Sequence, residues 1–431
     1  TFTLSSFLCG ASPSLNAMVF FRILQGLSGG ALQPISQAIL LETFPPAQQG
    51  MAMALWGIGI VVSPVLAPLL GGWLTDNYNW RWIFYINIPV GIITLFMTNL
   101  FIFDPPYARR QKTRIDVWGI ILLAIAVASL QIVLDKGERE DWFSSYLITT
   151  LAILSVIGFM ALIIQELRTS EPVVGLRVFK DRTFTLGTIT MFLFGLGLYA
   201  MISLLPLYVQ NLMGYTALKS GLVNSSRGAG VLIMMPLAGL LLKKLSPRWV
   251  VMLAVPFLIQ SLVVFAHLNL EAGFSNIIWP NFTQGIGIGL VFVPLTTATM
   301  SNISQEKMGN ATGVFNLARN IGGSIGIAAT QTLFLRFSQA HQSFLVYHTS
   351  SYNPAFQNMA ENIKHGMMAQ GSDAWTATHQ SLTVIYGMIQ RQAAMMAYID
   401  IFWLVAGVIL LILPLAFLMK PKKGGAPTLA H

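Results

Sequence analysis

The sequence predicts an all-α integral membrane protein whose two halves repeat each other. Hydrophobic residues make up 55% of the chain and charged residues 10%, whereas about 25% of a soluble domain is charged. So much apolar surface cannot be hidden in a soluble core, so lipid is the expected solvent. The segments Gln25–Gly30 and Gln284–Gly289 share one pattern and lie 259 residues apart. A duplicated membrane bundle is typical of secondary transporters, whose binding site lies between the halves.

The repeat extends beyond these two segments. At the same offset Gly50 falls on Gly309, and Trp56 falls on Phe315. Two consecutive apolar segments and the loop between them are therefore duplicated, which predicts two related half-bundles.

Eleven apolar segments are long enough to span, because a helix needs about 20 residues to cross the hydrocarbon. Residues 1–11 are expected to be the end of a further span. The second copy of the repeat begins eight spans after the first, whereas two six-span halves in direct succession would place it six spans after. This spacing predicts a 6+2+6 layout with a two-span insert. If the halves are equal in length, about 75 residues, or two and a half spans, would precede Thr1. The eleven segments are 17–40, 51–74, 82–103, 117–134, 144–165, 184–208, 217–242, 249–270, 276–300, 310–335 and 397–419.

Lys and Arg are distributed unevenly between the two sides of this layout. One set of alternate loops and the C-terminal tail carries 15 of them, the other set carries 7, and 3 lie within spans. The positive-inside rule makes the first side cytoplasmic, so the net charge of +9 is a topology signal rather than a nucleic-acid footprint. The charged turn Asp135–Asp141 then lies outside. The predicted units are 1–103 (an incomplete N-terminal half), 104–183 (a basic loop and the insert), 184–419 (the C-terminal half with an outer loop at 337–395) and 420–431 (a cytoplasmic tail).

The sequence gives no sign of enzymatic chemistry. A single cysteine, Cys9, excludes a disulfide framework or a Cys-based metal site within the chain. No P-loop, His cluster or Ser/His/Asp arrangement is visible. We therefore expect no catalytic residue, no metal and no bound cofactor.

Three motifs follow one another on consecutive predicted spans. They are Phe21–Gly26 with the glycines after it, Ser63–Gly72, and Trp80–Gly91. They resemble the fourth-, fifth- and sixth-span signatures of the major facilitator superfamily, and the third is similar to that of its 14-span drug:proton antiporters, the EmrB/QacA group. The resemblance runs the length of the chain. Ala67 departs from it, because the fifth-span antiporter motif often has Gly there, and the family's first-span acidic residue would precede Thr1.

The resemblance implies a proton-driven multidrug efflux antiporter of the bacterial inner membrane. Such a protein exports apolar or amphipathic compounds by alternating access and needs no cofactor besides the proton gradient. The resemblance also implies two partners, a periplasmic EmrA-like adaptor and a TolC-like outer-membrane channel. The alternatives are an exporter of one metabolite or a proton symporter of the same fold, and a membrane receptor or scaffold that does not transport.

Arg22 is the first candidate for proton coupling. A cation inside the hydrocarbon costs about 2.5–3.5 kcal/mol, so Arg22 should face a cavity and find a partner on another span. A fixed positive charge there would tune the protonation of a carboxylate; the alternative is that Arg22 binds carbonyls at a kink. The fifth-span motif is the second candidate, because Pro and Gly break or flex a helix, either as a plain kink or as a gate that limits proton leak. The gating candidates are Pro64, Pro68, Gly71 and Gly72.

Polar and aromatic residues within the spans are candidates for the substrate cavity. Such side chains also hold helices together, so each has a packing interpretation beside the binding one. The cavity candidates are Gln25, Gln33, Trp56, Asn87, Asn224, Arg227, Gln284, Asn316 and Arg319. The small-xxx-small pairs that should let helix backbones approach are Gly26 with Gly30 and Gly285 with Gly289.

The outer segment 337–395 is too long for an ordinary connection and is predicted to hold two helices. The first is amphipathic and covers 354–368, and the second begins at a cap formed by Ser372 and Asp373. The segment is either a lid or interfacial helix, or a docking site for the adaptor. The apolar residues expected to form its surface are Met359, Ile363, Met367, Trp375, Leu382 and Ile389, and Ile385 follows the helical spacing of the second helix.

Overall fold

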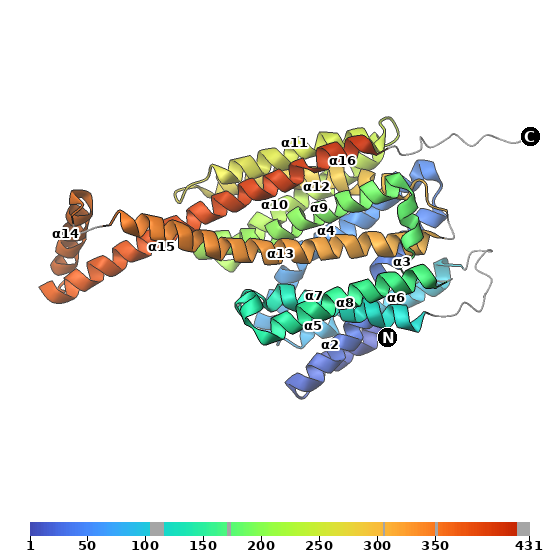
Figure 1. The fold of residues 1–431 in the computed structure, drawn as a ribbon, viewed down its shortest axis with the longest axis horizontal. Coiled ribbons are helices and arrows are strands. Elements are labelled where there is room, and N and C mark those ends of the chain that lie inside the picture. Colours follow the sequence, from blue (N-terminus) through green and yellow to red (C-terminus); the bar gives the residue numbers. More distant parts are fainter. Residues whose placement is uncertain (104–115, 170–173, 305–306, 350–351, 420–431) are drawn as a thin grey trace, which may run out of the picture.

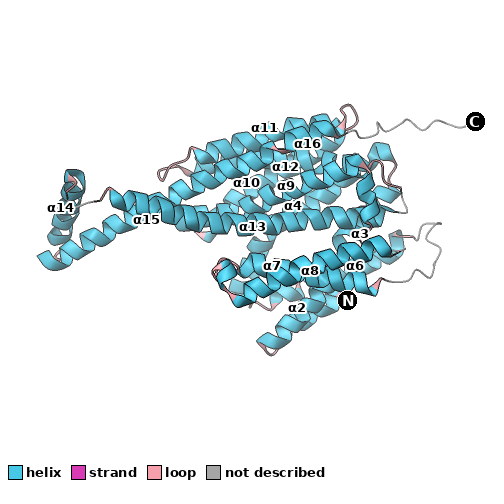
Figure 2. Cartoon of the chain, in the orientation of Figure 1, coloured by secondary structure: helices cyan, strands magenta, loops and turns pink. Residues whose placement is uncertain are grey.

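The computed structural model describes residues 1–103, 116–169, 174–304, 307–349 and 352–419. Within these ranges the chain is helical and contains no strand (Figure 2). Seven of the described helical segments are long and apolar enough to cross a membrane. The all-helical prediction is confirmed, whereas the eleven spans and the 6+2+6 layout remain predictions. The seven segments are Trp82–Phe101, Val117–Lys136, Tyr146–Arg168, Arg182–Leu212, Pro247–Ala266, Phe274–Met300 and Ala374–Leu418.

The first predicted span, 17–40, is two helices rather than one. A break at Gly30 and Ala31 separates α2 from α3. Pro34 has no N–H to donate to the carbonyl of Gly30, and the preceding glycines favour helix poorly, so the hydrogen-bond ladder is interrupted there. The N-terminal helices are α1 (Phe2–Gly10), α2 (Leu15–Gly29), α3 (Leu32–Thr43), α4 (Pro46–Asn77), α5 (Trp82–Tyr85) and α6 (Asn87–Phe101).

Helix α4 joins the two halves. It runs without interruption through Pro64 and Pro68, so the motif does not end the helix, and the predicted kink or gate stays a prediction. The burial of Pro64, Pro68 and Gly72 lies outside the described part of the structure, and Gly71 is half-buried. At its other end α4 packs on α10, where a Cβ on Gly239 would lie 3.0 Å from the carbonyl oxygen of Gly50. Only glycines allow two backbones to come this close.

The predicted insert is a hairpin of α7 (Val117–Lys136) and α8 (Tyr146–Arg168). Small residues let the two helices approach, and the Ser155 hydroxyl donates to the carbonyl of Ala126 at 3.0 Å. The hairpin contacts α13 through a 2.7 Å hydrogen bond from the Ser324 hydroxyl to Oε1 of Gln131. A one-turn helix, η1 (Trp142–Ser144), lies in the turn between α7 and α8.

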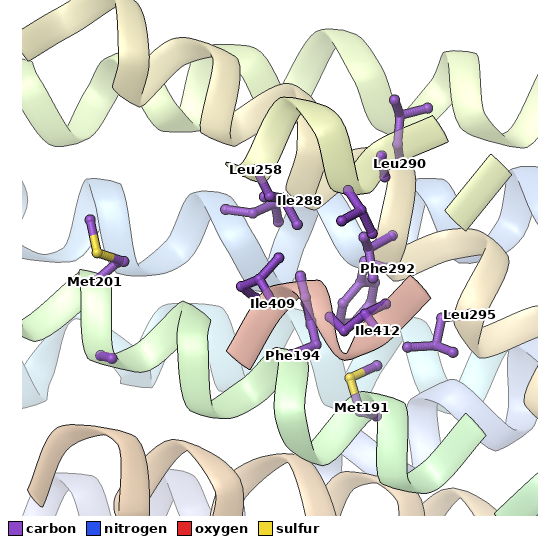
Figure 3. Close-up of a cluster of buried hydrophobic side chains, with 14 of the residues drawn as sticks. Met191, Phe194, Met201, Leu258, Ile288, Leu290, Phe292, Leu295, Ile409 and Ile412 are labelled. Carbon is purple, nitrogen blue, oxygen red and sulfur yellow. The ribbon is translucent and has the colours of Figure 1, made fainter. Parts of the chain in front are cut away.

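The C-terminal half is a densely packed bundle. Its apolar core draws side chains from α9, α11, α12, α15 and α16, among them Phe194, Leu258, Phe292 and Ile409 (Figure 3). Close packing follows from the glycines of α12 and α13, which face neighbouring backbones. The elements are η2 (Leu176–Lys180), α9 (Arg182–Leu207), η3 (Tyr208–Leu212), α10 (Ala217–Leu241), α11 (Pro247–Ala266), α12 (Phe274–Met300), α13 (Met308–Tyr347), α15 (Ala374–Leu410) and α16 (Ile412–Leu418).

The predicted outer loop 337–395 is largely a continuation of two long helices. Helix α13 extends to Tyr347 and α15 begins at Ala374, with α14 (Pro354–Ala369) between them. Together they form a projection that leaves the bundle (Figure 1). The predicted cap is confirmed at Asp373, whose carboxylate accepts from the N–H groups of Trp375 and Thr376. Hydrogen bonds from Thr376, above all, hold the pKa of Asp373 below its usual value.

Turns that the charge pattern assigns to opposite sides of the membrane lie at opposite ends of the bundle. The turn between α7 and α8 and the projection lie at one end, and the start of α13 and the end of α16 lie at the other (Figure 1). The described basic residues Lys243, Lys244 and Lys307 belong to turns at this second end. The basic run at 109–114 and the tail 420–431 lie outside the described residues.

Candidate functional site

Two polar stripes face each other where the halves meet, one on α3 and one on α13. Nη2 of Arg319 donates to Oε1 of Gln33 at 2.8 Å. Nδ2 of Asn316 donates to Oε1 of Gln37 at 2.6 Å, and the Thr312 hydroxyl donates to the carbonyl of Pro34 at 3.3 Å. Thr312, Asn316 and Arg319 recur at helical spacing, so one face of α13 carries all three. We call the set Gln33, Gln37, Trp56, Phe292, Asn316 and Arg319 the inter-half site.

Aromatic rings form the wall beside this polar contact. Trp56 of α4 donates its indole N–H to the hydroxyl of Ser36 at 2.9 Å, which fixes the ring beside α3. The same ring stacks on Phe292 of α12 with centroids 6.0 Å apart. Phe292 belongs to the apolar core in Figure 3, so the site has a rigid apolar backing from the C-terminal half.

Arg319 is the charged member of the inter-half site. Its side chain is 2% exposed, and its guanidinium lies 6.0 Å from the ring centre of Phe292. The hydrogen bonds recorded for it within the described chain go to amide oxygens, those of Gln33 and Asn320. A buried cation held by neutral amides keeps its net charge, so it favours an anion or an acidic group nearby.

A second buried arginine holds the C-terminal half together. Nε of Arg227 on α10 donates to Oδ1 of Asn281 on α12 at 2.9 Å. Asn281 also donates to the carbonyl of Val223, so one amide ties the two helices at several points. Asn224, predicted to face the cavity, donates to the carbonyl of Ser220 on its own helix. This cluster lies within one half, so its geometry favours the packing interpretation for Arg227 and Asn224.

Gln284 lies at a small cavity inside the C-terminal half. The cavity has a volume of about 10 Å³ and an otherwise apolar lining that includes Phe194, Met201 and Leu258. A single water needs about 10–15 Å³ of such volume, so no drug-sized compound fits. Oε1 of Gln284 is buried without a protein partner in the described chain.

Arg22 lies on α2, among the N-terminal helices. Its Nη1 donates to Oε1 of Gln25 at 3.3 Å, and its guanidinium lies 4.5 Å from the ring centre of Phe84. Both partners are neutral, so within the described contacts the expected carboxylate is not beside it. Asn87 donates to the hydroxyl of Ser6 at 3.0 Å and so ties α6 to α1.

The two glycine pairs behave differently. A Cβ on Gly285 would collide with the carbonyl oxygen of Arg227, and one on Gly289 would lie 3.1 Å from the backbone of Met235. The packing role predicted for this pair therefore has a partner, helix α10. A Cβ on Gly26 meets nothing within 4 Å, and one on Gly30 meets the carbonyl of Gly26 on its own helix. The predicted partner of this N-terminal pair is not found in the described chain.

Sequence reasoning missed several residues of these contacts. Gln37 lies one turn after Gln33, and this spacing places it on the same face of α3. Asn281 falls on Arg22 at the repeat offset of 259, so the repeat itself would have identified it. Phe292 carries no signal of its own, because phenylalanine is common in membrane spans. Helical spacing could thus have identified Gln37, and the repeat could have identified Asn281, but neither signal identifies Phe292.

Known proteins match this chain over most of its length. The sequence profile of the Major Facilitator Superfamily matches residues 1–327. Over 427 residues the chain is 36% identical to the multidrug export protein EmrB of Escherichia coli (strain K12), covering 98% of this chain and 81% of that protein. It is 34% identical to the fatty acid resistance protein FarB of Neisseria gonorrhoeae over 422 residues, covering 97% and 81%.

A solved structure matches the fold as well. The human organic anion transporter MFSD10 (TETRAN) superposes with a TM-score of 0.55 and 13% sequence identity, covering 95% of this chain and 74% of that one. At this identity the likeness concerns the fold alone.

Proposed function

We propose that this chain, which belongs to the Major Facilitator Superfamily, is a proton-driven multidrug efflux antiporter that works by alternating access. It is a multi-pass inner-membrane transport protein of the EmrB type and not an enzyme. Beyond family membership and transporter type, the proposal specifies the energy source, the transport cycle and the partners. No cofactor is required, because the proton gradient supplies the free energy.

The polar contact between α3 and α13 is the observation that supports alternating access. By the predicted topology, the end of α3 and the start of α13 are cytoplasmic. Thr312 and Asn316 lie within the first three turns of α13, so we infer that the inter-half site closes the inner half of the transport path. Hydrogen bonds between membrane helices are worth about 0.6 kcal/mol each, so a few of them can break and re-form. A transporter needs a closed state that is only slightly preferred, since a ligand shifts an equilibrium only by its difference in affinity.

The same site suggests which compounds are carried. Trp56 and Phe292 offer stacked apolar surface, and Arg319 offers a buried positive charge beside the amide of Gln33. We infer that amphipathic compounds with an apolar body and an acidic or polar end are preferred. The relative named for fatty acid resistance agrees with this chemistry.

Proton coupling is assigned to a cavity carboxylate that acts beside Arg22. Arg22 has only neutral partners among the described contacts, the amide of Gln25 and the ring of Phe84. Its charge is thus free to act on an acidic group that approaches in another state of the cycle. Proton binding would favour one orientation of the halves and substrate the other.

The projection is the proposed docking site for a periplasmic EmrA-like adaptor, which would pass the compound to a TolC-like channel. Trp375 is 74% exposed, and Met359 and Leu382 are also exposed, whereas Ile385 is buried. Ile363, Met367 and Ile389 are half-buried, so the apolar surface is smaller than the sequence predicts. Exposed apolar surface on a stiff helical projection is typical of a contact site.

Reconstituted transport tests the main proposal. In proteoliposomes, an acidic amphipathic dye should move against its gradient when protons flow the opposite way, and a protonophore should stop it. Dye that moves with the protons would identify a symporter. Dye that binds the purified chain but never crosses the membrane would identify a receptor or scaffold.

A matched pair of double variants tests docking. Trp375→Ser with Leu382→Ser should reduce co-purification of the adaptor and leave dye binding unchanged. Phe143→Ser with Tyr146→Ser is the control, because these exposed residues lie in the turn between α7 and α8 and at the first residue of α8. Loss of dye binding with retained adaptor would mean that the projection is a lid.

A further inference from the structure

An ion pair joins α13 and α15 close to where the projection leaves the bundle. Nε2 of His341 lies 2.6 Å from Oδ2 of Asp400, which is within ion-pair distance. The His341 side chain is 24% exposed and that of Asp400 is 43% exposed, so the described chain encloses neither of them. Neither residue takes part in the inter-half site.

Neighbouring contacts place the pair at the outer end of the bundle. His267, at the outer end of α11, lies 5.9 Å from the ring of Trp403 on α15. Asp400 precedes Trp403 by three residues, about 4.5 Å farther along α15 toward the projection. The protons whose influx would drive export arrive from this side of the membrane in the predicted topology.

The groups packed around His341 and Asp400 are neutral, and the charged groups lie farther away. Toward the bundle, Tyr208 of η3 and Tyr398 of α15 pack against each other with neutral phenol rings. Arg336 on α13 and Arg391 on α15 are exposed and lie more than one helical turn away in sequence. The turn after α11 adds His267 and Glu271, and α14 brings its charged residues, Glu361 and Lys364, to the far end of the projection (Figure 1).

We propose that His341 and Asp400 form a proton-binding pair that holds α13 against α15 most tightly when His341 is protonated. A carboxylate only accepts hydrogen bonds, so Nε2 carries a hydrogen in either charge state of the ring and a captured proton sits on Nδ1. Imidazole changes its charge between about pH 5 and 8, a range in which a carboxylate stays ionised. The contact therefore joins two opposite charges in acid and a neutral ring to a carboxylate in base, so protonation of His341 adds a Coulomb attraction to the same hydrogen bond.

The pair also has a route to the inter-half site. Helix α13 is continuous from Met308 to Tyr347. It carries Arg319 and Asn316 at one end and His341 about 33 Å farther along. A proton bound at the outer end thus acts on the helix that closes the inner end.

Thermal unfolding of the purified chain in detergent tests the pair without requiring transport. Between about pH 5.5 and 8, His341→Gln and Asp400→Asn should each lower Tm by about 1–2 °C at the acid end and by less at the basic end. His348→Gln is the matched control, since His348 is an exposed histidine on the same projection and bonds the carbonyl of Phe344. It should keep the wild-type profile.

Two results would overturn the proposal. One is that His341→Gln and Asp400→Asn lower Tm by the same amount at every pH, which identifies a structural contact that binds no proton. The other is that His348→Gln changes the profile as much as His341→Gln does. Because unfolding needs no transport, the pair can fail while the antiporter proposal stands, and the reverse also holds.

Discussion

The two copies of the repeated motif have similar sequences and opposite surroundings. Helix α12 buries most of its length, including Gln284, Gly285 and Gly289. Helix α2 buries Gln25 alone within the described chain, and Ile23 and Leu27 beside it are exposed. The glycine pattern thus marks a surface suited to close approach, but the approach itself requires a helix opposite.

The comparison also separates two uses of a polar residue at one repeat position. Asn281 falls on Arg22 at the 259-residue offset. Asn281 is fully buried and ties α10 to α12, whereas Arg22 rests on Phe84 and Gln25 and is exposed. Within the described chain the C-terminal copy thus contributes to stability, and we propose that Arg22 in the N-terminal copy contributes to function.

The largest expected effect concerns this pair of positions. Asn281→Ala removes a hydrogen bond to the buried charge of Arg227 and should cost about 1.5–3 kcal/mol of stability. Arg22→Ala should leave expression largely intact and cost no more than about 0.5–1.5 kcal/mol, the value of its hydrogen bond to Gln25, but it should abolish coupled efflux. Arg22→Lys should be partly active because Lys keeps the charge without the planar fork. Tm and proteoliposome efflux measure the two properties separately. Wild-type efflux by Arg22→Ala would show that the two copies do not differ in this way.

The glycines provide the next contrast. Gly285→Ala places a Cβ against the backbone of Arg227, which cannot move aside cheaply, so it should destabilise the chain by about 1–3 kcal/mol. Gly26→Ala adds a methyl group in open space and should change Tm little. Size-exclusion yield and Tm of the two variants check this. Equal losses would mean that α2 has a partner in the membrane that these contacts do not include.

The glutamines should give the smallest difference. Gln25→Leu removes the acceptor of Arg22 and should cost about 0.5–1.5 kcal/mol. Gln284→Leu replaces a buried oxygen that has no protein partner in the described chain, so it should be neutral or slightly stabilising. Tm again measures both. A large loss for Gln284→Leu would indicate that a water in the small cavity bonds this side chain.

Composition and periodicity predict much of the fold, because apolar length and helical spacing are properties of single segments. The all-helical architecture, the paired helices at 117–168 and the cap at Asp373 follow from such local signals. The break at Gly30 and Ala31 was missed because hydropathy does not register the lost donor of Pro34. The length of α13 and α15 was missed because polar residues beyond the membrane interrupt the apolar pattern but not the helix.

The candidate site is harder to predict from sequence, because it depends on which helices meet. Gln33, Trp56, Asn316 and Arg319 were candidates for a cavity, and the structure brings them together. Arg227 and Asn224 looked equivalent in sequence but lie within one half. Nothing in a single sequence indicates that α3 faces α13 while α10 faces α12.

Locking the two polar stripes together tests the central claim most directly. Gln37→Cys with Asn316→Cys, in a Cys9→Ser background, places one thiol on α3 and one on α13, where the native side chains are 2.6 Å apart. A short bifunctional thiol reagent should cross-link the two in the resting state and stop proton-driven efflux, and cleavage of the linker should restore it. Efflux that continues at the uncross-linked rate in fully cross-linked protein would contradict the account, because α3 and α13 would then not separate during transport.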